Sequence, residues 1–165
     1  MASSGNALER DGKFYVRDDP RLGRIRGLDP WAVENGIHLI RAEEDAAEGV
    51  MMIDHTNTQQ YGTVHGGVLV AFADTIAGHS LTPHGKMCVT QGSTVNFLRP
   101  ASGAYLFCRA TPQKVGRRIC VVYVEQRNDR DELGTTALFT FAVVKEIEPI
   151  VVEPKHPNLT FGEGK

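Results

Sequence analysis

Cysteine is scarce in this chain of 165 residues, and the three that occur, Cys88, Cys108 and Cys120, lie far apart. Without a CxxC pair, the sequence has neither the spacing of a zinc site nor that of a dithiol redox motif. The six histidines show no ligand spacing either. Isolated cysteines in apolar segments are typical of proteins from a reducing compartment. We therefore expect a cytoplasmic protein that requires no metal and no separate cofactor.

Long apolar runs and an excess of positive charge are also missing. No segment approaches the roughly 20 apolar residues that a membrane-spanning helix needs. The N-terminal segment lacks the apolar core of a signal peptide. The formal net charge is −2 and the two signs are mixed along the chain, which gives no basic surface for nucleic acid. We expect neither a membrane nor a nucleic acid as partner.

Apolar residues make up 41% of the chain, which is enough for the core of one domain. Residues 1–34 are polar and predict an N-terminal arm. Within it, LDPWAVENG has the signals of a short helix, with Asp29 as N-cap, Pro30 at the first position and Gly36 at the end. Residues 35–147 form the expected domain, and residues 148–165, which carry three prolines, are predicted to be an irregular tail.

The domain is predicted to be α+β, with two strands, one long helix and four more strands in that order. Period-two apolar patterns predict the strands, and a 3.6-residue period predicts the helix. No helix separates the late strands, so antiparallel pairing is expected. An antiparallel sheet of about six strands wrapped around the helix is the simplest arrangement. The strands are expected at about 37–45, 48–56, 86–98, 104–115, 117–127 and 134–146, and the helix at about 66–81.

A single acidic residue, Asp74, interrupts the stretch YGTVHGGVLVAFADTIAG at residues 61–78. A helix without a charged face is expected to be buried on most sides, where an unpaired carboxylate is costly. By helical period, Asp74 shares one side with small residues, namely Gly67, Ala71, Ala77 and Gly78. These neighbours leave room for a ligand, which favours a general base or a nucleophile. A structural carboxylate held by an arginine or by hydroxyls is the alternative.

The motif HGG, His65 to Gly67, begins this helix. Glycines let another group approach the backbone closely, and the first N–H groups of a helix carry partial positive charge. Such a position can hold a developing oxyanion. The alternative is ordinary turn chemistry, with His65 as a structural hydrogen-bonding residue.

Three further groups of polar residues are candidates for the same site. Upstream amides could orient a water or a carbonyl, a later strand could run beside the helix, and the cluster KVGRR could contact phosphates. For each group, an ordinary loop or a solvated strand end is the alternative. The residues are Asn57, Gln59 and Gln60 upstream, Thr90 and Gln91 in the strand, and Lys114, Arg117 and Arg118 in KVGRR.

The segments GTVHGGVLVAFADTIAG, NFLRPASG and VGRR, in this order, resemble the hotdog-fold acyl-CoA thioesterases of the PaaI-like, 4-hydroxybenzoyl-CoA thioesterase superfamily. The resemblance covers roughly residues 35–146. It implies a hotdog fold, an antiparallel sheet around a long helix, and active sites at the interface of a homodimer, which can pair into a homotetramer. Coenzyme A would enter only as part of the substrate.

The resemblance also assigns roles. The family's acid falls on Asp74 and its oxyanion-holding N–H on Gly66, with His65 beside it. Its polar residue seven positions earlier falls on Gln59, and its strand hydroxyl falls on Thr90. Members with Ser or Thr one turn after the acid have Gly78 here.

Two other functions are compatible with such a domain. A hydratase or dehydratase acting on acyl-CoA needs an acid–base pair, and the sequence identifies no histidine partner for Asp74. A non-catalytic acyl-CoA-binding module gains nothing from a buried acid. The expected activity is therefore hydrolysis of an acyl-CoA, with aromatic and medium-chain acyl groups both open and with Asp74 as base or as nucleophile.

Overall fold

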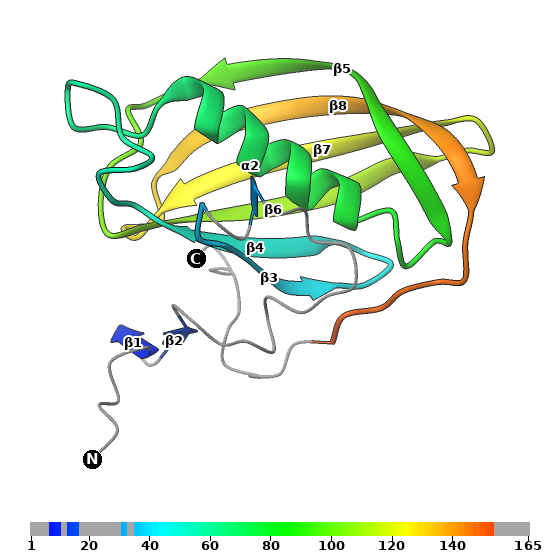
Figure 1. Cartoon of the computed structure of the whole chain (residues 1–165), viewed down its shortest axis with the longest axis horizontal. Helices are drawn as coiled ribbons and strands as arrows, with labels where there is room; N and C mark the ends of the chain where they lie inside the picture. Colours follow the sequence, from blue (N-terminus) through cyan, green and yellow to red (C-terminus); the bar gives the residue numbers. More distant parts are fainter. Residues whose placement is uncertain (1–6, 11–12, 17–30, 33–34, 154–165) are drawn as a thin grey trace.

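The structure, a computed structural model, describes residues 7–10, 13–16, 31–32 and 35–153 (Figure 1). In the N-terminal region, β1 (Ala7–Arg10) and β2 (Lys13–Val16) pair antiparallel as a separate two-stranded sheet. The short helix predicted there is described only at Trp31 and Ala32, and its predicted start lies outside the described residues. Gly36 has a φ of +68°, the left-handed conformation that glycine adopts after a helix end.

A six-stranded sheet forms the body of the domain, and all its neighbouring strands pair antiparallel, as predicted. The spatial order is β3-β4-β6-β7-β8-β5, so the strand that follows the helix in sequence, β5, lies at one edge. The four late strands match their predicted bounds to within two residues. The strands are β3 (Ile37–Ala42), β4 (Ala47–Met52), β5 (Lys86–Phe97), β6 (Tyr105–Val115), β7 (Ile119–Asn128) and β8 (Leu133–Glu146).

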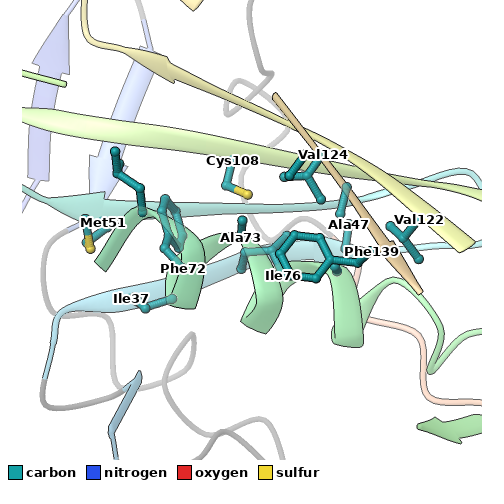
Figure 2. Packing of buried hydrophobic residues seen from close by; sticks show 14 of the residues in the cluster. Ile37, Ala47, Met51, Phe72, Ala73, Ile76, Cys108, Val122, Val124 and Phe139 are labelled. Carbon is teal, nitrogen blue, oxygen red and sulfur yellow. The ribbon is translucent and has the colours of Figure 1, made fainter. Parts of the chain in front are cut away.

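Helix α2 (Gly66–His79) lies across one face of this sheet (Figure 1). Phe72 and Ile76 are fully buried, and in Figure 2 Ile76 lies beside Phe139 whereas Phe72 lies on the side of Met51. Burial of each such side chain contributes about 1.5–3 kcal/mol. Gly49 on β4 makes room for this packing, since a Cβ there would collide with Ile76.

The expectation that α2 is buried on most sides is wrong for the single chain. Leu69, Phe72, Ala73, Ile76 and Ala77 are buried against the sheet, whereas the opposite face is only partly covered. Ala77 was expected on the side of Asp74 but has no exposed surface and belongs to the core. The uncharged outer face of the helix therefore needs a further explanation, which is taken up below.

After β8 the chain turns back and runs to β3, at the opposite edge of the sheet (Figure 1). We call this segment, residues 147–153, the C-terminal strap. The N–H of Ile150 donates to the Thr82 carbonyl at 2.9 Å. Val152 and Ala42 exchange two backbone hydrogen bonds of 2.8 Å. The tail predicted to be irregular thus forms no regular strand here, but it is fastened to the domain. No helix in the described part of the chain is long and apolar enough to cross a membrane.

Candidate active site

Asp74 and Thr90 come together from α2 and from the edge strand β5. The Thr90 hydroxyl donates a hydrogen bond of 2.6 Å to Asp74 Oδ1. The register of β5 against β8 shifts between Thr90 and Gly92, which makes Gln91 the additional residue of a bulge. Such bulges redirect neighbouring side chains and are frequent beside active sites. Thr90 and Gln91 were both predicted as site residues on this strand. Thr90 contacts the Asp74 carboxylate, whereas Gln91 is the additional residue of the bulge.

A cavity of about 550 Å³ opens beside this pair. Asp74 is half-buried at its wall. Gly78, one turn later, adds open space, because a Cβ built on it would meet only a Phe141 ring carbon at 4.0 Å. The cavity is lined by Asp74, Thr75, Gly78, His79, Thr82, Lys86, Met87, Cys88, Val89, Thr90, Phe141, Ile147 and Ile150. The small residues predicted around the carboxylate therefore do leave room for a ligand at Gly78.

The helix start uses its three HGG residues differently. His65 is the N-cap, and its Nδ1 accepts the Gly67 N–H at 2.9 Å. Because Nδ1 is the acceptor, a neutral His65 carries its proton on Nε2. The Gly67 N–H is therefore engaged by the cap in the single chain, and its substrate-binding role stays a prediction. The N–H of Gly66, at the first helical position, has no acceptor within the helix.

Gly66 lines a second, smaller cavity of about 330 Å³, together with Phe97 and Arg99. Its N–H and the Asp74 carboxylate are eight residues apart on α2, which corresponds to about 12 Å along the axis. A single carbonyl group cannot contact both groups within one chain. The predicted oxyanion-binding N–H of Gly66 and the predicted catalytic carboxylate of Asp74 therefore lie in separate cavities of the monomer.

The upstream amides belong to the loop that leads into α2. Asn57 is buried, donates to the Met52 carbonyl at 2.7 Å and accepts from the Asp54 N–H at 3.0 Å, so both polar atoms of its amide are engaged within the protein. Gln59 donates to the Thr63 hydroxyl at 2.7 Å and accepts from the Tyr61 N–H at 2.7 Å. Both ends of the Gln59 amide are thus used inside the loop. The structure does not bring either amide to Asp74.

The basic residues Lys114, Arg117 and Arg118 are exposed at the hairpin between β6 and β7. The Arg118 carbonyl accepts the Val143 N–H at 2.9 Å, which ties the hairpin to β8. The pKa of Glu146 is lowered, chiefly by its hydrogen bond from Lys86 and to a smaller extent by Arg117. Val143, which is bonded to Arg118, pairs with Cys88 of β5, and Cys88 and Lys86 both line the Asp74 cavity. The basic hairpin therefore lies toward the Lys86 end of that cavity.

Several cavity residues were not predicted from the sequence, among them Cys88, His79 and the strap residues. Strand alternation could have suggested Cys88, but the register of β5 also shifts between Met87 and Cys88. Burial, and next to it the nearby Cys120 thiol, raises the pKa of Cys88 to about 12. Cys88 therefore stays a protonated thiol near neutral pH and is a poor nucleophile. Across the described residues, no group of three or more His, Cys, Asp or Glu could hold a metal ion.

Comparison with known proteins places this arrangement among thioesterases. Residues 61–135 match the family model of the thioesterase superfamily. The chain is 30% identical over 105 residues to acyl-coenzyme A thioesterase PaaI of Escherichia coli, a match that spans 63% of this chain and 74% of the relative. A thioesterase of known structure from Haemophilus influenzae is 32% identical, with a TM-score of 0.65 over 70% of this chain and 82% of the other.

A hypothetical thioesterase from Streptococcus pneumoniae, solved with coenzyme A, has a TM-score of 0.65 over 68% of this chain and 88% of its own. At 23% identity, this likeness concerns the fold alone. Together with the H. influenzae structure, it confirms the predicted hotdog arrangement of a six-stranded antiparallel sheet and one long helix.

Proposed function

The chain belongs to the thioesterase superfamily and is a thioester hydrolase, and we propose that it hydrolyses acyl-CoA with Asp74 as the catalytic carboxylate. The observation that carries this assignment is the 2.6 Å hydrogen bond from Thr90 to Asp74 at the wall of a large cavity. A carboxylate held in one orientation beside open space can act on a bound substrate. The name of the E. coli relative supports acyl-CoA as the substrate class.

In this mechanism Thr90 is a positioning residue, because its hydroxyl fixes the carboxylate. Asp74 either removes a proton from a water that attacks the thioester carbonyl, or attacks the carbonyl itself to give a mixed anhydride that water then cleaves. In both routes the C–S bond breaks and coenzyme A leaves as the thiol. A single turnover in ¹⁸O-labelled water tests for the nucleophilic route, since label enters the Asp74 side chain only when water attacks the Asp74 carbonyl of the anhydride.

The oxyanion of the tetrahedral intermediate would be held by the Gly66 N–H of a second subunit. The separation of about 12 Å between Gly66 and Asp74 along one helix requires this division of labour. A homodimer, alone or paired into a tetramer, would also cover the outer face of α2 and the edge strand β5. Met87, Val89 and Phe97 of β5 are 52%, 54% and 55% exposed, and an apolar edge strand calls for a partner.

Light scattering tests this assembly, and we expect at least a dimer at assay concentrations. An active, stable monomer would exclude a site shared between subunits.

The proposed reaction needs no separate cofactor, because coenzyme A enters as part of the substrate and leaves as the thiol. We place its phosphates near the basic hairpin, where Arg117 and Arg118 are exposed at the Lys86 end of the cavity. The three cysteines are free thiols, which supports the cytoplasm as the compartment.

The direct test of the function is release of free coenzyme A, followed with a thiol reagent, from a panel of acyl-CoAs. The panel contains phenylacetyl-CoA, benzoyl-CoA and straight-chain acyl-CoAs of two to sixteen carbons. Hydrolysis of at least one substrate, with saturation kinetics, is the expected result. Tight binding of acyl-CoA without release of the thiol would instead identify a binding module.

A further inference from the structure

A buried glutamine contacts the backbone of α2 one turn after the helix begins. Gln126 lies on β7, on the same face as the core residues Val122 and Val124, and is 1% exposed. Its side-chain nitrogen donates a hydrogen bond of 2.8 Å to the carbonyl of Leu69. Because a carbonyl can only accept, this contact also fixes which end of the amide faces the helix. Leu69 follows Gly66 by three residues, so the sheet holds the first turn of α2 by a polar contact.

The stability of the domain does not explain this glutamine. The side-chain oxygen of Gln126 is buried without a hydrogen-bond partner among the described residues, and so is the hydroxyl of Thr135, its direct neighbour on β8. Buried polar atoms of this kind cost free energy and call for an explanation. The Leu69 carbonyl lies inside α2, where the N–H four residues later already serves as its partner. An apolar side chain of the same shape would therefore suit the core at least as well.

The start of α2 needs such a contact because its first two residues cannot pack. Gly66 and Gly67 have no side chains, and glycine loses more conformational freedom on folding than any other residue. On the loop side, the N–H of His65 is held by a loop carbonyl at 2.9 Å. On the helix side, Leu69 is the first buried residue. Its apolar packing has no preferred direction, whereas the hydrogen bond from Gln126 depends on the rotation and the axial position of the turn.

We infer that Gln126 is a positioning residue for catalysis, which holds the first turn of α2 where the Gly66 N–H meets the oxyanion. This role rests on the proposed function, because it assumes that the Gly66 N–H stabilises the tetrahedral intermediate. Leu69 connects the two groups, since Gln126 holds its carbonyl and Leu69 lines the same cavity of about 330 Å³ as Gly66. A displaced donor stabilises the transition state less. Binding of the uncharged substrate depends less on that donor, so kcat should change more than KM.

The test compares Gln126→Met with Thr135→Val as the matched control. Both changes nearly keep the shape of the side chain and remove a buried polar atom without a partner, but only the first removes the contact with α2. Gln126→Met is expected to lower kcat about tenfold, less than the loss of a whole oxyanion donor, with KM within about twofold of wild type. Its melting temperature should stay the same or rise. Thr135→Val should keep both kinetic constants within about twofold of wild type.

Backbone hydrogen exchange of the full chain, followed by mass spectrometry, provides a second readout that needs no hydrolysis. Exchange over residues 66–73 should be several-fold faster in Gln126→Met and unchanged in Thr135→Val, because only the first variant loosens the helix start. Unchanged exchange in Gln126→Met would overturn the inference. So would a wild-type kcat in that variant, or a loss of activity that accompanies a lower melting temperature. If wild type cleaved no acyl-CoA while exchange still rose in Gln126→Met, the contact would stand and only the proposed function would fail.

Discussion

Two carboxylates in this protein have opposite surroundings. Glu48, on β4, is 3% exposed and bridges two guanidinium groups, with Arg41 Nε at 3.0 Å and Arg109 Nη1 at 2.6 Å. Asp74, on α2, accepts a hydrogen bond from a neutral hydroxyl and borders a cavity of about 550 Å³. Glu48 is paired with two arginines inside the protein, whereas Asp74 is held in orientation and remains beside space that a substrate can enter.

The comparison shows why burial alone does not identify a catalytic acid. A buried carboxylate with two arginine partners is compensated, and removal of its charge weakens the pairing of both cations, although Asp45 still contacts each of them and Glu43 contacts Arg41. A carboxylate that serves catalysis at a cavity wall often lowers stability. The same chemical change, carboxylate to amide, should therefore produce opposite phenotypes at the two positions.

The largest effect is expected from Asp74→Asn, which keeps the shape of the side chain but removes the base or nucleophile. We expect kcat to fall by about two orders of magnitude or more, the scale for loss of one acid–base group. The melting temperature should stay the same or rise. Turnover and thermal melting, measured side by side with wild type, provide the check. Full activity, or a variant that unfolds, would make Asp74 a structural residue and exclude the mechanism.

Glu48→Gln is the matched control with the reverse outcome. The amide removes the buried negative charge between Arg41 and Arg109, while the more exposed Asp45 still contacts both arginines. Arg109 is 38% exposed and can turn to water, so we expect a loss of only about 2 kcal/mol in the free energy of unfolding. For a chain of this size, that corresponds to a melting temperature lower by about 4–8 °C. Activity at 25 °C should change less than threefold. A large loss of activity without a loss of stability would contradict the division between the two carboxylates.

The sequence predicted the sheet, the helix and Asp74 because each of them depends on local pattern. The apolar periods of strands and helices can be read from one sequence, and so can a single acidic residue in an otherwise apolar helix. Thr90 was proposed as part of a strand that could run beside the helix, and the family resemblance gave it a role. Its approach to the acid depends on β5 pairing with β8 rather than with β6. The strap residue Ile150 could not be predicted, because it reaches the cavity through backbone bonds to Thr82 and not through any periodic pattern.

The predicted roles of Gly67 and Asn57 stay predictions for a related reason. Polar groups in a loop often form hydrogen bonds with the backbone and side chains of that loop. The Gly67 N–H is used by the His65 cap, and the Asn57 amide by the backbone at Met52 and Asp54. Sequence identifies such groups as available donors and acceptors, but only coordinates show which of them remain for a ligand.

Thr90→Ala tests how much the orientation of Asp74 contributes. It removes a hydrogen bond to a carboxylate, an interaction of about 1.5–3 kcal/mol, part of which water can replace because Thr90 is exposed in the single chain. We expect kcat to fall roughly tenfold with little change in KM. Thr90→Ser keeps the hydroxyl and should retain most of the activity. If serine and alanine were equally impaired, the methyl group and not the hydrogen bond would be the relevant feature.

The smallest effect is expected at the basic hairpin, where charge acts through solvent. Arg117 and Arg118 are exposed, so each contact with a phosphate is worth at most about 1 kcal/mol. Replacing both by alanine should raise KM for acyl-CoA several-fold with kcat nearly unchanged, the mark of lost uniform binding. The increase should shrink as salt is added, because exposed charges are screened.

Acyl-pantetheine, which lacks the nucleotide and its phosphates, is the matched substrate control for this double variant. Its KM should be the same in wild type and in the variant, since no phosphate is present to meet the hairpin. An unchanged KM for acyl-CoA would remove both arginines from the site. A parallel rise for acyl-pantetheine would mean that the substitutions disturb β8 through the hydrogen bond between Arg118 and Val143, and that the hairpin shapes the cavity without binding the phosphates.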